Sequence, residues 1–211
     1  MRLISSIRQG LASRTFLLLF SSLLVIYLSI AYVASEPRPQ ERFLSISTLG
    51  SNMMAGHYYP SNSSLIDTGY DVNWYLNVYN RMGNPEYLSI RVKLINSTQT
   101  VPDDNLHLPS PENHIIELRH MLANDSTWVA PLSWTITEID KKQDYVVIKG
   151  LKINDVEFDD LHIASSDGDF RLIFELWRYD TETNDFSFTW SSGLDERSTW
   201  NQIWFSVIPR T

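Results

Sequence analysis

The chain has 211 residues, of which 17 are Lys or Arg and 25 are Asp or Glu, and it contains no cysteine. The absence of cysteine excludes a disulfide scaffold, a thiolate zinc site and an iron–sulfur cluster. The net charge of −8 argues against a phosphate-backbone binder, which needs clustered Lys and Arg, so we expect no nucleic-acid partner. Hydrophobic residues make up 43% of the chain, too many for a disordered protein.

Residues 15–35 form an apolar segment without a single charge. At the rise of an α-helix, this segment spans roughly 31 Å and matches a hydrocarbon core of about 30 Å. The positive-inside rule places residues 1–14 in the cytoplasm, because the only charges before the segment are three arginines. These are Arg2, Arg8 and Arg14. We therefore expect a single-pass cell-membrane protein that contacts the lipid bilayer through residues 15–35 and places its C-terminal region outside the cytoplasm.

A cleavable signal peptide is the alternative interpretation of this segment. Val33, Ala34 and Ser35 would suit a cleavage site, since small residues are typical there. The apolar run of residues 16–34 is longer than the usual signal core of about 7–15 residues, which favours a retained anchor. A buried helix of a soluble protein is disfavoured because the segment has no polar face.

A short stalk is expected at residues 36–41, where Pro37 and Pro39 favour extended backbone. From residue 42 onward the apolar residues recur with period two, which is typical of β-strands. Residues 70–80 and 86–95 both alternate in this way, and turn residues lie between them. The pair therefore predicts a β-hairpin or a closely connected pair of strands.

Seven further segments have strand-like alternation, separated by turn residues. They are residues 42–48, 114–121, 126–139, 145–153, 170–179, 186–191 and 200–208. Residues 114–122 would also tolerate a helical turn, and the polar residues 97–113, with three prolines, are expected to wrap the domain as a loop. About nine short strands without a further helix predict an all-β protein in which residues 42–211 form one antiparallel β-sandwich.

The run of residues 69–99, GYDVNWYLNVYNRMGNPEYLSIRVKLINSTQ, resembles the core motif of an archaeal family of membrane-anchored proteins whose domain has no established function. Residues 118–122, 170–180 and 200–207 resemble the same family. The resemblance implies an N-terminal membrane segment and an extracytoplasmic immunoglobulin-like or fibronectin-like domain. It implies no catalytic residue, because none is established for that family.

Metal binding was considered at three groups of residues. His107, His114 and His120 match no strong metal-binding spacing, and in a strand the last two would stand about 20 Å apart. Two acidic runs lack the complete pattern of a calcium loop. These runs are Asp167-Gly168-Asp169 and the set Asp155, Glu157, Asp159 and Asp160. We therefore expect no metal and no other cofactor.

No nucleophile elbow, zinc-protease pair or phosphate-binding glycine loop is present. Paired carboxylates would suit glycoside hydrolysis, but with 25 acids the sequence cannot show which of them meet. The sequence therefore predicts a protein without catalytic residues. An extracellular carbohydrate-active enzyme remains the alternative.

The seven tryptophans divide into expected core residues and candidate binding residues. Trp74 alternates with apolar residues and is expected in the core. Trp200 and Trp204 share one strand face, whereas Ile203 and Phe205 occupy the other, so one of these faces is a candidate for exposure. Burial in the core of the sandwich is the favoured interpretation, and Trp200 and Trp204 are candidate binding aromatics in the alternative that their face is exposed.

Three glycosylation sequons begin at Asn62, Asn96 and Asn124, each in a predicted loop or strand end. Together these features predict a cell-surface binding or assembly module that recognises a cell-surface protein or a glycan. An accessory subunit of a membrane complex is a further alternative, in which the anchor helix would make the contacts.

Overall fold

The computed structural model describes residues 2–35, 41–192 and 195–208, and the chain divides into two compact units, Met1–Gln40 and Glu41–Thr211. The first unit contains helix α1, Arg2–Ser35. Within it, Phe16–Ser35 is long and apolar enough to cross a membrane, a test that a signal sequence also passes. The expected stalk lies outside the described residues, apart from its last position.

Three serines in the apolar part of α1 make hydrogen bonds within the helix. The hydroxyls of Ser21, Ser22 and Ser29 donate to backbone carbonyls three or four residues earlier, at 2.8–2.9 Å. These three hydroxyls are therefore satisfied without a second helix.

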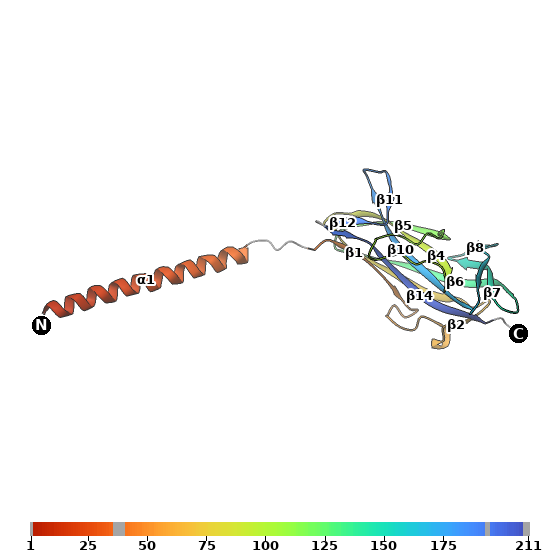
Figure 1. Cartoon of the computed structure of the whole chain (residues 1–211), viewed down its shortest axis with the longest axis horizontal. Coiled ribbons are helices and arrows are strands. Elements are labelled where there is room, and N and C mark those ends of the chain that lie inside the picture. The colour runs from red at the N-terminus through yellow and green to blue at the C-terminus, as the bar shows by residue number, and fades with distance from the viewer. Residues whose placement is uncertain (1, 36–40, 193–194, 209–211) are drawn as a thin grey trace. The chain divides into compact units, whose positions relative to one another are not determined.

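Two β-sheets form the second unit (Figure 1). The first sheet has the order β1 (Phe43–Leu49), β3 (Val72–Arg81), β6 (Ser126–Lys141), β7 (Val146–Ile153) and β8 (Val156–Phe158), with β9 (Ile163–Ser165) also beside β7. The second sheet has the order β2 (Leu65–Asp67), β14 (Thr199–Ile208), β10 (Asp169–Asp180), β4 (Glu86–Asn96) and β5 (Ile116–Leu122), with β11 (Asp185–Ser187) beside β10. The short strands β12 (Trp190–Ser192) and β13 (Asp195–Arg197) pair with each other, and η1 (Pro60–Asn62) is a 3₁₀ turn.

The core lies between the two sheets and is centred on Trp74, which is buried as the sequence predicts. Its ring packs edge-on against Trp134 and Phe174, with centroid separations of 5.2 and 6.1 Å. Its indole N–H donates to the carbonyl of Tyr58 at 2.5 Å. The ring therefore joins both sheets while its one polar atom is satisfied.

The strand order confirms the antiparallel, immunoglobulin-like sandwich, with one rearrangement. The run β14, β10, β4, β5 of the second sheet corresponds to the face of an immunoglobulin domain that contains strands G, F and C. In the first sheet, the earlier strand β6 lies next to β3 and the later strand β7 lies outside it. An immunoglobulin domain has the reverse arrangement, with the later strand E next to B.

The hairpin predicted from residues 70–80 and 86–95 is wrong, because β3 and β4 belong to opposite sheets. Asn80, which is fully buried at the end of β3, holds the crossing. Its side-chain Nδ2 donates to the carbonyls of Asn84 and Leu122 at 2.9 and 3.0 Å, and its Oδ1 accepts from the backbone N–H of Met82. Each strand buries its apolar face against the opposite sheet instead of pairing with the other.

Two other local predictions change in the structure. Residues 116–122 form strand β5, so the helical alternative is wrong. The single strand predicted at residues 186–191 is broken into β11 and β12. Strands β2, β8, β9 and β13 were not predicted, since each has only three residues and shows no periodicity.

Candidate binding groove

The outer face of the second sheet is covered by residues 97–113, called here the covering loop, as the sequence predicts. Outward-facing residues of β4 and β10 are buried although they point away from the core, among them Lys93, Ile95, Arg171, Ile173 and Glu175. Hydrogen bonds from Lys93, Arg171 and Trp200 reach backbone and side-chain oxygens of the loop. The loop is therefore an integral layer of the domain.

A buried ion pair between β4 and β10 binds the covering loop through Ser110. Lys93 Nζ lies 2.9 Å from Glu175 Oε1, and the two side chains are 4% and 0% exposed. Lys93 also donates to the carbonyl of Ser110 at 2.6 Å, and the backbone N–H of Ser110 donates to Glu175 at 2.8 Å. Both charges are thus paired and hydrogen-bonded, which is the condition for burying them.

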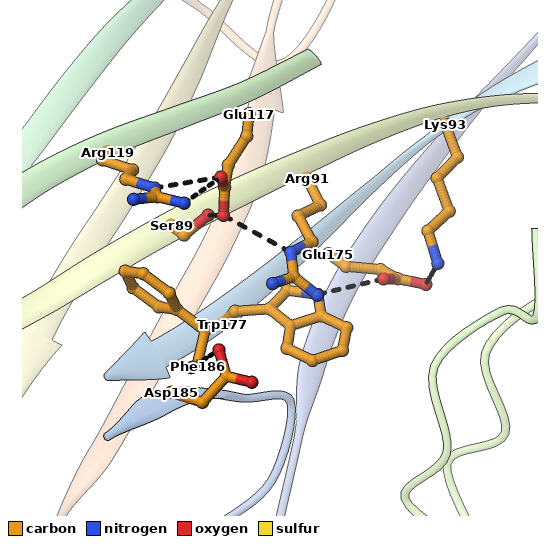
Figure 2. Close-up of polar contacts among 9 residues, drawn as sticks. All are labelled: Ser89, Arg91, Lys93, Glu117, Arg119, Glu175, Trp177, Asp185 and Phe186. Atoms are coloured by element: carbon orange, nitrogen blue, oxygen red, sulfur yellow. Dashed lines mark hydrogen bonds and ion pairs between the residues drawn. The ribbon is translucent and has the colours of Figure 1, made fainter. Parts of the chain in front are cut away.

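A row of charged side chains continues this network toward the edge of the sheet (Figure 2). Glu117 on β5 accepts hydrogen bonds from Ser89 at 2.6 Å and from Arg119 at 2.5 and 2.9 Å, and it pairs with Arg91 at 3.4 Å. Burial acts to raise the pKa of Glu117, but the hydrogen bonds from Arg119 and Ser89 outweigh it, and the pKa stays below its usual value. Glu117 is therefore held in its ionised form.

Trp177 on β10 links the two parts of this network. The guanidinium of Arg91 lies 3.7 Å from the centroid of its ring, and its indole N–H donates to Glu175 at 3.0 Å. Figure 2 shows Trp177 between these two partners. The contact of the ring with Arg91 and the hydrogen bond from the indole N–H to Glu175 together fix the orientation of the Trp177 side chain in the free protein.

A groove of about 480 Å³ lies where Trp177 meets the covering loop and the β10–β11 hairpin, which projects from the sandwich (Figure 1). We call it the aromatic groove. It is lined by Leu106, His107, Leu108, Pro109, Trp177, Asp180, Thr183, Asp185, Phe186, Ser187, Phe188, Thr189 and Glu196.

The wall contributed by the covering loop is apolar and exposed. Leu106 and Leu108 are 65% and 54% exposed. A short bridge between Asp103 and Leu108 presents them, and the carboxylate of Asp103 accepts from the N–H groups of Asn105 and Leu106. Two exposed leucines on a hydrogen-bonded turn facing aromatic side chains form the kind of apolar patch that marks interaction sites.

The lining of the aromatic groove carries negative charge. Asp180, Asp185 and Glu196 line it, and neither Lys nor Arg does. Within the described part of the chain, none of these three carboxylates belongs to an ion pair. Asp180 and Asp185 instead accept hydrogen bonds from local N–H groups, which fixes their directions.

Trp200 and Trp204, the candidate binding aromatics, lie on the outer face of β14 and do not line the aromatic groove. Trp204 is 41% exposed, and the guanidinium of Arg171 lies 4.4 Å from the centroid of its ring. Trp200 is partly buried and donates to Asp104 of the covering loop at 2.6 Å. Phe205, on the other face, is buried in the core. Trp200 thus helps to hold the loop, and Trp204 is the more exposed of the two, with one face of its ring covered by Arg171.

The residues considered for metal binding lie apart. His107 contacts Ser198, and His120 stacks on Trp128 with a centroid separation of 4.9 Å. Asp167 accepts from Ser165, from the N–H of Asp169 and from Ser97, and these hydrogen bonds lower its pKa. Among the residues that the structure describes, no group of three or more His, Asp or Glu has the geometry of a metal site.

The three sequon asparagines differ in accessibility. Asn62 is exposed, and its Oδ1 contacts His57. Asn96 is partly buried, and its Nδ2 donates to the carbonyl of Ala164 at 2.7 Å. Asn124 is also partly buried, and its amide bonds Gly83 and Asp125. The amide nitrogen that a glycan would modify is therefore most accessible at Asn62.

The aromatic groove was not found from the sequence. Its residues come from the covering loop, from residues 177–189 and from Glu196, and no local pattern joins these segments. One signal was present, because alternation along β10 places Trp177 on the same face as Arg171 and Glu175. A tryptophan on the charged face of a strand is the feature that points to this surface.

The fold and the groove together define the class of the protein. It consists of an apolar N-terminal helix followed in the sequence by a β-sandwich domain with an acidic, aromatic groove. The chain matches no protein-family model, and it matches no curated protein. Among solved structures it is similar to the CARDB domain of a Pyrococcus furiosus protein in complex with di-metal ions, at 12% identity and a TM-score of 0.41. That match covers 82% of this chain and 95% of the other. The resemblance to the archaeal membrane-anchored family stays a prediction.

Proposed function

We propose that this protein is a non-catalytic binding module of the cell surface, anchored by residues 15–35 with its sandwich on the extracytoplasmic side. The aromatic groove is its binding site. The observation that carries this proposal is the combination of exposed Leu106 and Leu108 with an oriented Trp177 in one groove. Aromatic side chains with restrained orientation are typical anchors of binding surfaces.

The proposed topology rests on the arginines before the apolar segment and on helix α1, in which the hydroxyls of Ser21, Ser22 and Ser29 are satisfied internally. We expect protease treatment of intact cells to remove residues 41–211. Protection of these residues from the protease would contradict the topology.

The groove is tested by photocrosslinking in intact membranes. A photoreactive amino acid replaces Leu108 in one variant and Val129 in the control, since Val129 is 37% exposed on β6 of the other sheet. We expect a discrete adduct from position 108 and none from position 129. Equal adducts from both positions, or none from position 108, would overturn the assignment of the groove.

A further inference from the structure

We infer that the aromatic groove binds a basic peptide segment of a partner protein, with lysine or arginine side chains directed at Asp180, Asp185 and Glu196. This inference rests on the proposed function and names the chemistry of the occupant. It follows from two properties of the groove, namely its fixed apolar walls and its three carboxylates, which have no ion-pair partner among the described residues.

The apolar walls fit the stems of long basic side chains. Leu106 and Leu108 face solvent on one side, and Trp177, Phe186 and Phe188 lie on the other. Lysine and arginine pack their methylene stems on apolar surface and keep the charged group at the polar rim. A purely aliphatic ligand would leave the three carboxylates of the lining without a positively charged partner.

Charge selects the cationic partner. The groove is lined by three carboxylates and by no Lys or Arg, and His107 is the only basic side chain among its lining residues. The described arginines around the groove already have ion-pair partners. Arg91 and Arg119 pair with Glu117, and Arg178, which lines a neighbouring cavity with Asp180 and Glu196, pairs with Glu86. Residues 36–211 carry 14 basic and 25 acidic residues, a balance of −11, which adds a long-range attraction for cations.

The aromatic rings at the groove already hold guanidinium groups within the molecule. Arg91 covers Trp177 at 3.7 Å, and Arg119 lies 4.9 Å from the centroid of Phe186. Both rings line the groove, and their contacts with the chain's own guanidinium groups and aromatic neighbours hold them in place. They therefore contribute fixed apolar surface to the groove.

The test measures peptide binding to the full-length chain in a non-ionic detergent, by fluorescence anisotropy. The probes are three capped seven-residue peptides that share the same apolar residues, leucine and alanine. These alternate with lysine in the first peptide, with glutamine in the second and with glutamate in the third. We expect the lysine peptide to bind, the glutamate peptide not to bind, and the affinity for the lysine peptide to fall at least about tenfold between low and high salt. Equal binding of the lysine and glutamine peptides would overturn the inference.

Isosteric variants locate the binding. In the groove variant, Asp180→Asn, Asp185→Asn and Glu196→Gln remove three charges, while the amide oxygens keep the local N–H bonds. The control variant removes three exposed charges elsewhere, through Asp144→Asn, Glu157→Gln and Asp159→Asn. We expect the groove variant to lower the affinity for the lysine peptide about tenfold and the control variant to lower it less than about twofold. Salt screens distant charges more than charges in contact with the peptide. Equal weakening in both variants would show general attraction to an acidic domain and would overturn the inference.

The outcomes separate this inference from the proposed function. A partner crosslinked from position 108, together with no binding of the lysine peptide, would refute the basic peptide and leave the groove as a binding site. No crosslink and no peptide binding would refute both. Thermal unfolding of each variant, followed by tryptophan fluorescence, shows whether the fold is retained.

Discussion

The buried pair of Lys93 and Glu175 gives the sharpest test of the structure. Lys93→Met keeps the length of the side chain and removes the cation. Glu175 would then retain the N–H groups of Ser110 and Trp177 but lose the positively charged partner with which it pairs, at a site where it is 0% exposed. A buried carboxylate without a counter-charge is strongly unfavourable.

The expected loss is about 3–5 kcal/mol of unfolding free energy, the usual cost of breaking a buried pair by removing one member. For a domain of this size, that corresponds to a fall in Tm of roughly 6–20 °C, at roughly 2–4 °C per kcal/mol. The double variant Lys93→Met with Glu175→Gln should lose less than Lys93→Met alone, since no unpaired charge then remains buried.

The assay is thermal unfolding of the full-length chain in detergent, followed by tryptophan fluorescence. All seven tryptophans lie within Glu41–Thr211, so the signal reports that unit alone. The control is Lys142→Met, because Lys142 pairs with Asp140 while 51% exposed, and we expect it to lower Tm far less than Lys93→Met does. If Lys93→Met lowered Tm no more than Lys142→Met, the burial of the Lys93–Glu175 pair beneath the covering loop would be refuted.

Three further predictions concern other parts of the domain. Gly50→Ala should lower stability by about 1–3 kcal/mol in urea unfolding, since its Cβ would lie 2.0 Å from the backbone oxygen of Gly56. Expression in a glycosylating host should modify Asn62 more than Asn96, as measured by peptide mass spectrometry, and preferential occupancy of Asn96 would contradict the contacts of its amide. The pKa of Glu117 is lowered in the folded state, so its stabilisation is present above its unfolded value of about 4.3 and is lost as the pH falls through the folded value. Glu117→Gln should therefore make Tm less sensitive to acid, and an unchanged slope of Tm against pH would refute this.

The buried pair and the aromatic groove share the covering loop. Ser110 joins the loop to Lys93 and Glu175, and residues 106–109 of the same loop form one wall of the groove. Loss of the pair should thus loosen the groove as well as the fold. Lys93→Met is expected to weaken the lysine peptide, whereas Lys142→Met leaves its affinity unchanged.

Sequence periodicity was enough to predict the long strands, and in β3 and β4 it also predicted which face is buried. Alternation in β3 and β4 places Trp74 and Leu88 toward the core, and both are buried. The apolar segment and the lack of cysteine are likewise visible in the sequence alone. These properties are local, because side chains alternate across a strand whatever its neighbours are.

The tertiary structure decided which strands pair and where the groove lies. The hairpin predicted for β3 and β4 failed because a period of two marks the inward face of a strand but does not name its partner. The groove depends on Leu108, Trp177 and Glu196, which lie far apart in the sequence and meet only because the covering loop and the β10–β11 hairpin border the same outer face. The sequence by itself determined that an apolar segment is followed by a cysteine-free β-sandwich. The packing of the covering loop on the charged face of one sheet decided where the proposed binding groove lies.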